Sequence, residues 1–306
     1  MENNGKASLF LLPFMFNFIV LGMIPLTLGI AASFFKFDSG DLTSMQFVGF
    51  YNYIRLFTGE AYVEFWQSLG ITALFTVVVV PLKILIPLGI AFLLSFKPAG
   101  YKVFQAILYF PTVVSVSIVG VLFTDIFSDS SMSLMNALLN VEWQWLSNDA
   151  LRWVVIVLAN LWSGTGTSAI ILLSAINNVP KSLHEACEAD GGNVWTRFCK
   201  VILPNLKGTI EIILFTSIIN SFNLYGLPLV IYGTTNEGAV VSPMMFIQSW
   251  LNNQPRMTGV ITAASIVFGL VIMSVTIIQR TVMNKKNKGD KYGKRYVEYK
   301  KAQEVA

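Results

Sequence analysis

The chain has 306 residues, of which 54% are hydrophobic and 12% are charged, and its formal net charge is +4. Ordinary soluble domains contain about 25% charged residues. The composition therefore excludes an ordinary soluble enzyme or binding module. It predicts a membrane protein that crosses the bilayer several times.

Six apolar runs follow one another along the chain, and each reaches or exceeds the roughly 20 residues that a helix needs to cross a bilayer core. Lipid offers no hydrogen bonds to the backbone, so we expect every run to be a helix. The first run is too long for a cleaved signal peptide and lacks a clear small-residue cleavage site. The predicted helices cover about 8–35, 67–96, 103–127, 152–177, 208–232 and 257–281. Together they form one domain, 1–283, which a basic tail at 284–306 follows.

The distribution of Lys and Arg predicts the orientation of these helices. With a cytoplasmic N-terminus, the cytoplasmic segments hold 16 of the 21 basic residues, the outer segments hold 4, and Lys83 lies within a helix. This bias is strong under the positive-inside rule, so we expect both termini in the cytoplasm. Cys187 and Cys199 then face a reducing compartment, which argues against a structural disulfide.

The densest polar segment of the chain, "LHEACEADGGNVWTRFCKVILP", lies between the fourth and fifth predicted helices, at 183–204. It holds the only histidine and both cysteines. On the predicted orientation it belongs to a cytoplasmic loop at 180–206. Such a loop suits docking to a protein partner, and an amphipathic loop lying on lipid headgroups is the alternative.

The local pattern of the 180–206 loop predicts two short helices. Ser182 and Glu185 have the spacing of a capping box at the start of the first helix. Gly191 and Gly192 are expected to end it, and Asn193 is expected to cap the second. Leu203 and Pro204 close the unit before the fifth membrane helix.

The same segment resembles the EAA loop of the inner-membrane permease subunits of binding-protein-dependent ABC importers. Two small residues depart from the pattern, because Cys187 replaces the second Ala and Gly192 replaces the Ala after Asp-Gly. The second change is expected to loosen the bend. The stretch "FVGFYNYIRLF" at 47–57 is similar to maltose- and glycerol-phosphate-type permeases, and to the first of their two non-identical subunits. The "TGGGP" turn that relatives often show before the sixth helix is missing.

The resemblance implies a type I ABC importer permease fold, all-α with six membrane helices, at the cytoplasmic (inner or plasma) membrane of a bacterium. In that family the loop docks into a cleft of a cytoplasmic ATPase and couples ATP binding to helix movement. The coupling residues implied here are Glu185, Ala186, Asp190, Gly191, Gly192, Phe198, Leu203 and Pro204.

The resemblance also implies the partners. They are a second homologous permease subunit, two copies of the ATPase and an extracytoplasmic sugar-binding protein, in contact with membrane lipid. The chain has no G-x-x-x-x-G-K-[ST] phosphate loop, so ATP and Mg²⁺ are expected on the ATPase and no cofactor on this chain. We expect the basic tail to lie near anionic lipid or against the ATPase, and not to bind nucleic acid.

Similarity to maltose-type permeases places a sugar pathway on the fourth and fifth membrane helices. Amides and hydroxyls there can bond sugar hydroxyls, although small polar residues in membrane helices often only pack helices together. The pathway candidates are Asn160, Ser163, Gly164, Thr167, Ser217, Asn220, Ser221 and Leu224.

Lys83 lies in the middle of the second predicted helix, where a charge is costly unless it is paired or faces water. One interpretation has it meeting an anionic sugar in the pathway. The interpretation that we favour from the sequence pairs it with Glu211, Asp125 or an acid of the partner subunit.

Two other classes of protein fit less well. A self-sufficient secondary transporter usually shows internal repeats and ionisable residues at mid-membrane, and here we find no convincing repeat and only Lys83 at depth. An intramembrane enzyme would need clustered acids or metal ligands within the helices, and the sequence shows none there, nor a metal site elsewhere. We therefore expect a non-catalytic subunit of an ATP-driven sugar importer.

Overall fold

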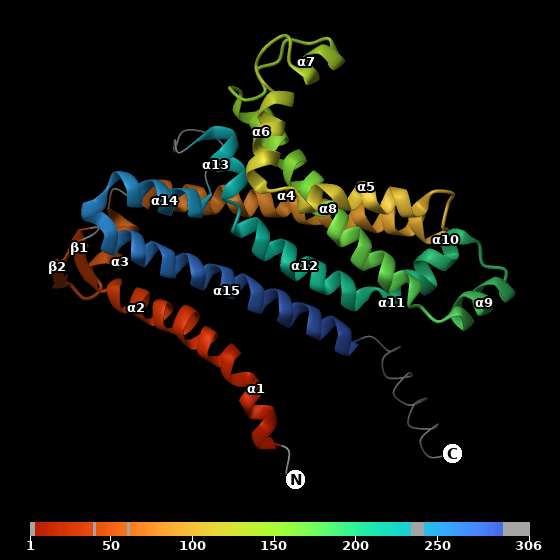
Figure 1. Cartoon of the computed structure of the whole chain (residues 1–306), viewed down its shortest axis with the longest axis horizontal. Coiled ribbons are helices and arrows are strands. Elements are labelled where there is room, and N and C mark those ends of the chain that lie inside the picture. Colours follow the sequence, from red (N-terminus) through yellow and green to blue (C-terminus); the bar gives the residue numbers. More distant parts are fainter. Residues whose placement is uncertain (1–3, 39–40, 60–61, 234–241, 290–306) are drawn as a thin grey trace. The chain divides into compact units, whose positions relative to one another are not determined.

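The computed structural model describes residues 4–38, 41–59, 62–233 and 242–289, and most of these residues are helical (Figure 1). They divide into two compact units. One unit consists of 1–69 and 243–271, and the other of 70–242 and 272–306.

The first unit combines the N-terminal helices with a small sheet and a later helical segment. β1 and β2 pair antiparallel, with Phe35 opposite Phe47. Its elements are α1 (Asn4–Asn17), the π-helix η1 (Phe18–Met23), α2 (Ile24–Ala32), β1 (Phe35–Asp38), β2 (Asp41–Phe47), α3 (Tyr51–Thr58), the start of α4 (Tyr62–Ser95), α14 (Pro243–Asn253), the 3-10 helix η3 (Pro255–Met257) and the start of α15 (Thr258–Gly289).

The small sheet corrects the predicted end of the first helix, which does not continue to residue 35, while the described chain remains predominantly helical. Asn52 of α3 gives the physical reason. Its Nδ2 donates to the carbonyl oxygens of Ser33 and Phe35, both at 2.8 Å. Carbonyls at the end of a helix need such outside partners, and beyond them the pairing of β1 with β2 satisfies the backbone.

Further polar and aromatic contacts hold the first unit together. The Tyr53 hydroxyl lies 2.7 Å from Oγ of Ser33, and Trp250 Nε1 donates to Glu64 Oε2 at 2.6 Å. A Cβ atom on Gly259 would lie 2.7 Å from Nδ2 of Asn52, so only glycine permits this approach. The "FVGFYNYIRLF" stretch therefore has a structural role, because it carries Asn52 and Tyr53.

The second unit contains the remaining helices, including the later parts of α4 and α15. Its other elements are α5 (Tyr101–Val113), α6 (Val116–Ile126), α7 (Leu134–Leu139), α8 (Asp149–Asn177), α9 (Lys181–Ala189), α10 (Val194–Arg197), the π-helix η2 (Phe198–Ile202), α11 (Leu203–Asn205), α12 (Lys207–Phe222) and α13 (Gly226–Tyr232).

Among the described residues, four helices are long and apolar enough to cross a membrane by length and composition, and two bent helix pairs raise the number to six if each pair is one span. The bent pairs are Tyr101–Val113 with Val116–Ile126, at 100°, and Val194–Asn205 with Lys207–Phe222, at 67°. The four single helices are Leu11–Ala32, Tyr62–Ser95, Asp149–Asn177 and Thr258–Met283.

The third predicted helix, 103–127, is broken into α5 and α6. Buried Pro111 lies in the last turn of α5, where it has no N–H to donate to the carbonyl of Ile107, so this turn is weakened. Ser115 is extended, and its Oγ accepts from the amide of Ile118 at 3.3 Å, which starts α6 in a new direction. The prediction of one straight helix missed these two signals.

The fifth predicted helix, 208–232, is also two helices. α12 ends at Phe222 and α13 begins at Gly226. In a continuous helix the ring of Pro228 would clash with the carbonyl of Leu224, and proline has no N–H to donate to that carbonyl. The sequence therefore contained the reason for this break.

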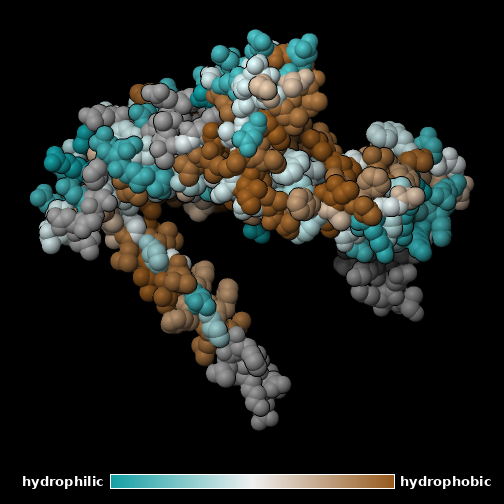
Figure 2. All heavy atoms as spheres, turned by 45° about the horizontal axis from the view of Figure 1, so that its top comes forward, coloured by the Kyte–Doolittle hydropathy of each residue, from teal (hydrophilic) through white to brown (hydrophobic). Residues whose placement is uncertain are grey.

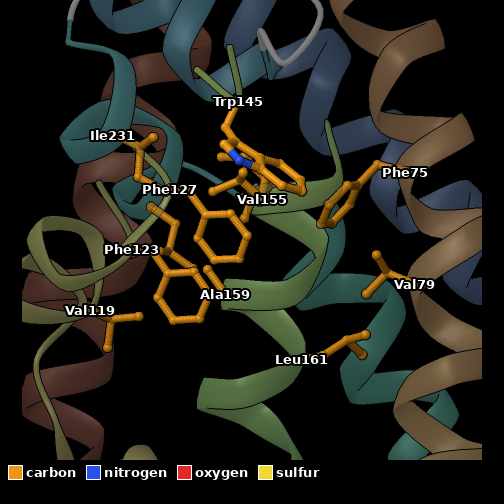
Figure 3. Packing of buried hydrophobic residues seen from close by; sticks show 13 residues of the cluster. Phe75, Val79, Val119, Phe123, Phe127, Trp145, Val155, Ala159, Leu161 and Ile231 are labelled. Carbon is orange, nitrogen blue, oxygen red and sulfur yellow. The ribbon is translucent and has the colours of Figure 1, made fainter. Parts of the chain in front are cut away.

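Two groups of buried side chains form the core of the second unit. The first apolar cluster joins α4, α6 and α8 to the 224–231 segment. Figure 3 shows the rings of Phe123, Phe127 and Trp145 gathered beside Val155 and Ala159. The second apolar cluster joins α4 and α8 to the 180–206 loop and α12 through Ile202, Leu206 and Ile213.

A folded segment at 128–148 covers the first apolar cluster. Buried Asn136 is its centre, because its Oδ1 accepts from Trp145 Nε1 at 2.7 Å. Its Nδ2 donates to the carbonyls of Trp143 at 2.9 Å and Ser130 at 3.1 Å. Asp129 closes the segment by accepting from the amide of Leu146 at 2.6 Å.

We expect Asn136→Ala to destabilise this segment, because each buried polar group left without a partner costs about 1–3 kcal/mol. Thermal denaturation of the purified protein in detergent should give a lower midpoint, and tryptophan fluorescence should shift to the red as Trp145 becomes exposed. Asn178→Ala, at an exposed amide after α8, is the matched control. Equal midpoints for the two variants would contradict the proposed role of Asn136.

Candidate functional site

A band of polar residues separates the two apolar clusters on three helices of the second unit. Each helix contributes to one cluster, then carries polar residues, and then contributes to the other cluster. The flanking apolar pairs are Val79 and Leu88 on α4, Ala159 and Leu172 on α8, and Ile213 and Leu224 on and after α12. We call the residues of this band the polar layer, and it comprises Lys83, Asn160, Ser163, Gly164, Thr167, Ser217, Asn220 and Ser221.

The closest approach within the polar layer joins α4 to α8. A Cβ atom on Gly164 would lie 3.7 Å from Cε and 3.8 Å from Nζ of Lys83. The amine therefore lies against a part of α8 that has no side chain. Within the described ranges, no carboxylate forms an ion pair with Lys83. The two intrachain pairs that the sequence suggested, with Glu211 and with Asp125, are thus not formed.

Asn160, Gly164 and Thr167 lie three or four residues apart and so share one face of α8. Asn160 is half-buried, and among the described residues its Oδ1 has no hydrogen-bond partner. Ser163 donates to the carbonyl of Asn160 at 3.3 Å, and Thr167 is exposed. This face carries, in a row, a buried acceptor without a partner among the described residues, a bare backbone and a hydroxyl.

The candidates on α12 divide between the surface and the interior. Asn220 is exposed, whereas Ser217 and Ser221 are buried. Ser221 Oγ donates to the carbonyl of Ser217 at 2.8 Å, so that hydroxyl is satisfied within its own helix. Leu224 is buried in the first apolar cluster. The contact of these residues with a substrate stays a prediction.

The 180–206 loop consists of α9, a glycine turn, α10, η2 and α11. α9 begins at Lys181 after Pro180, with no side-chain cap, so the prediction of Ser182 as the cap is wrong. The amide of Leu183 already donates to the carbonyl of Pro180 at 3.1 Å, which starts the helix before Ser182 can act as a cap. The predicted capping box with Glu185 is therefore absent.

The glycine turn and the second cap were predicted correctly. Gly191 has φ of +73°, a conformation that favours glycine. Asn193 Oδ1 accepts from the amide of Thr196 at 2.8 Å and from its hydroxyl at 2.9 Å. Both features follow from local backbone chemistry, and this explains why they could be read from the sequence.

Contacts from one basic and one aromatic residue fasten the loop to the end of α4. The guanidinium of Arg197 lies 5.7 Å from the ring centroid of Phe96, and it pairs with Glu188 of α9 at 3.0 Å. The rings of Phe198 and Phe92 lie 4.6 Å apart between centroids. α9 is thereby tied to α10, and α10 and η2 are tied to α4.

The free side of the loop combines acidic and apolar groups. Glu185, Ala186 and Asp190 are exposed, as are Leu183 and Trp195, the latter with 67% of its surface accessible. Of the other predicted coupling residues, Gly191 and Pro204 are exposed, while Phe198 and Leu203 pack against the second apolar cluster. In Figure 2, hydrophilic side chains gather at this loop and at the 128–148 segment, and hydrophobic side chains cover the surface between them.

The sequence did not reveal Arg197, Glu188, Phe92 and Phe96 as parts of the attachment. Phe92 and Phe96 lie four residues apart at the end of the second predicted helix, and this aromatic pair was the available signal. The pairing of Lys83 with Gly164 had no sequence signal, because it depends on how α4 and α8 pack.

Cys187 and Gly192, the two departures from the loop pattern, lie against each other. A Cβ atom on Gly192 would lie 2.5 Å from Sγ and 2.7 Å from the carbonyl oxygen of Cys187. The amide of Gly192 donates to that same carbonyl at 2.8 Å. The larger side chain at 187 thus requires the smaller residue at 192, and the turn is tight where we expected it to be loose.

We expect Gly192→Ala to displace α9 from α10 and to weaken the bond from residue 192 to the Cys187 carbonyl. Hydrogen–deuterium exchange should then become faster at the amides of 190–197. Adding Cys187→Ala should reverse part of the effect, because it removes the Sγ contact but leaves the carbonyl contact. Cys199→Ala, at the exposed cysteine, is the control for thiol removal. Exchange that is equally slow in Gly192→Ala and in the unaltered chain would show that the turn tolerates the Cβ.

Comparison with known proteins places these features in a family. The sequence model of the binding-protein-dependent transport system inner membrane component family matches residues 84–288. The chain is 29% identical over 288 residues to the arabinooligosaccharides transport system permease protein AraP of Halalkalibacterium halodurans, covering 91% of this chain and 87% of the relative. It is 28% identical over 285 residues to AraP of Bacillus subtilis, covering 90% and 88%.

A solved structure has a similar fold. It is a bacterial alginate ABC transporter in complex with an alginate pentasaccharide-bound periplasmic protein, and one of its chains matches with a TM-score of 0.78 and 21% identity over 94% of this chain and 96% of that chain. The family match covers more than half of the sequence. The chain therefore belongs to the family of binding-protein-dependent transport system inner membrane components and is a multi-pass membrane permease.

Proposed function

We propose that the chain is the first of two non-identical permease subunits of an ATP-driven importer and forms half of the pathway for a sugar or oligosaccharide. The observation that carries this proposal is the polar layer, which lies between two apolar clusters in a member of the permease family. Amides, hydroxyls and a glycine that adds no side chain suit sugar hydroxyls. Relatives named for arabinooligosaccharides support the substrate class.

In this proposal the chain crosses the membrane six times. The bent pair Tyr101–Val113 and Val116–Ile126 forms the third span, and Lys207–Phe222 belongs to the fifth. Both termini lie in the cytoplasm, which follows from the 16 to 4 distribution of Lys and Arg. The 180–206 loop then faces the cytoplasm and the 128–148 segment faces outward. A sugar-binding protein delivers the substrate from outside, as the periplasmic protein in the related alginate transporter structure suggests.

The 180–206 loop is the proposed contact with a cytoplasmic ATPase, of which the importer holds two copies. Its exposed face, with Glu185, Leu183 and Trp195, can fill a cleft on another protein. Because Arg197 and Phe198 fasten the loop to α4, movement of the loop is passed to the membrane helices as a rigid-body rotation. ATP and Mg²⁺ bind on the ATPase, since this sequence has no phosphate loop.

Purification of the tagged chain from membranes in mild detergent, followed by mass spectrometry, tests the subunit composition. We expect to recover a second six-helix permease and an ATPase. For each copy of this chain there should be one copy of the second permease and two copies of the ATPase. The binding protein should be recovered when its sugar is present. A chain that purifies alone and moves solute in liposomes without ATP would show a self-sufficient secondary transporter instead.

We expect the double variant Glu185→Ala, Gly191→Pro to separate ATP hydrolysis from import. Proline cannot adopt the φ of +73° that Gly191 requires, so the turn must change, and alanine removes the exposed carboxylate. In proteoliposomes, uptake should fall to background while the permease pair still assembles in the membrane. Glu142→Ala, a carboxylate removed from the 128–148 segment, is the control and should import normally. Normal uptake by the double variant would show that the loop is only a surface feature.

A further inference from the structure

We propose that Lys83 makes the pathway selective for acidic oligosaccharides, because its amine pairs with a carboxylate of the passing sugar within the polar layer. This inference rests on the proposed function as a sugar permease and names the substrate class of that site. It is carried by the position of Lys83, by the groups around it and by the absence of acidic residues from the polar layer among the residues that the structure describes.

An ammonium group within a membrane helix is costly unless an anion or water compensates for it. No described carboxylate pairs with Lys83. Glu211 lies two residues from Ile213 of the second apolar cluster, and Asp125 lies two residues from Phe123 of the first. Both acids therefore sit at the level of a cluster, and neither sits in the polar layer between them.

Two backbone features lie beside Lys83. Gly164 presents bare backbone beside the amine, and any larger residue there would bring its side chain against Cε and Nζ. The lysine lies between Pro81 and Pro87 in α4. Pro87 has no N–H to donate to the carbonyl of Lys83, so the helix leaves one acceptor of this residue without its usual helical donor.

The neighbouring groups match the chemistry of an acidic sugar. The amine of Lys83 is a cationic donor, and Oδ1 of Asn160, one helical turn from Gly164, is an acceptor without a partner among the described residues. A sugar that bears a carboxylate and adjacent hydroxyls can satisfy both. A neutral sugar could bond Asn160 but would leave the ammonium group without an anion.

A lysine suits a transport site better than a bidentate arginine would. Its ammonium is a compact point charge on a flexible stem, and it holds a carboxylate without a fixed geometry. A transport site must bind strongly enough to admit the ligand and weakly enough to release it. A single flexible cation meets both demands.

The test compares acidic sugars with neutral ones. The importer, purified with its partner subunits and its binding protein, is placed in proteoliposomes, and ATP-dependent uptake is measured. The probes are trisaccharides of galacturonic, glucuronic, mannuronic and guluronic acid, the same trisaccharides with methyl-esterified carboxyls, and a neutral arabinotriose. Binding of each probe to the isolated binding protein is measured separately, because Lys83 does not influence that step.

We expect wild-type uptake of at least one free acid, and a loss of at least about tenfold in Lys83→Gln, as expected for removal of one partner of a buried charge pair. Lys83→Arg should keep more of the uptake than Lys83→Gln because the charge remains. Lys102→Gln, at an exposed lysine at the start of α5, is the matched control and should leave uptake unchanged.

Three results would overturn the inference. Uptake of neutral probes alone, equal in wild type and Lys83→Gln, would remove the acidic substrate and leave the proposed function intact. Loss of the assembled complex in Lys83→Gln, with acidic and neutral uptake falling together, would assign Lys83 to an ion pair with an acid of the partner subunit. Absence of ATP-dependent uptake for every probe in the wild type would contradict the proposed function itself.

Discussion

The interruption of apolar packing between α4, α8 and α12 is the constraint on which the functional features depend. Helices in a membrane are held together by close packing and by hydrogen bonds between them, because lipid is as apolar as their side chains. Here two apolar clusters provide the packing and leave a polar level between them. The clusters fix the backbones of the three helices, so the polar groups keep their positions without having to hold the helices together.

The second apolar cluster also connects the 180–206 loop with the pathway. Ile202 and Leu206 lie within this cluster, and Phe198 packs against it. In the proposed mechanism a displacement of the loop therefore moves the ends of α4, α8 and α12 together. The polar layer lies directly beyond these ends, which gives a short physical route from an ATPase to the substrate. The salt bridge between Glu188 and Arg197 keeps α9 and α10 moving as one piece.

The sequence predicted local structure correctly where the interacting groups lie within one short segment. Asn193 caps α10 and Gly191 forms the turn because the required partners lie within a few residues. The sequence-based prediction of unbroken helices failed near Pro111, Ser115 and Pro228. These residues signal helix ends, but the long apolar runs around them suggested continuous helices. Sequence-based prediction also failed at Ser182, because α9 begins two residues too early for that side chain to cap it.

The sequence by itself determined that the chain is a membrane protein, where its apolar helices lie, which loop carries the docking pattern and which polar residues lie between apolar ones. These are properties of single segments, set by hydrophobicity over roughly 20 residues and by local backbone chemistry. The tertiary structure alone decided that Lys83 lies against Gly164, that Ser217 and Ser221 are buried while Asn220 is exposed, and that Cys187 and Gly192 fit each other. Such relations depend on the rotation and spacing of packed elements, which side-chain shapes from distant parts of the chain fix only when the whole unit has folded.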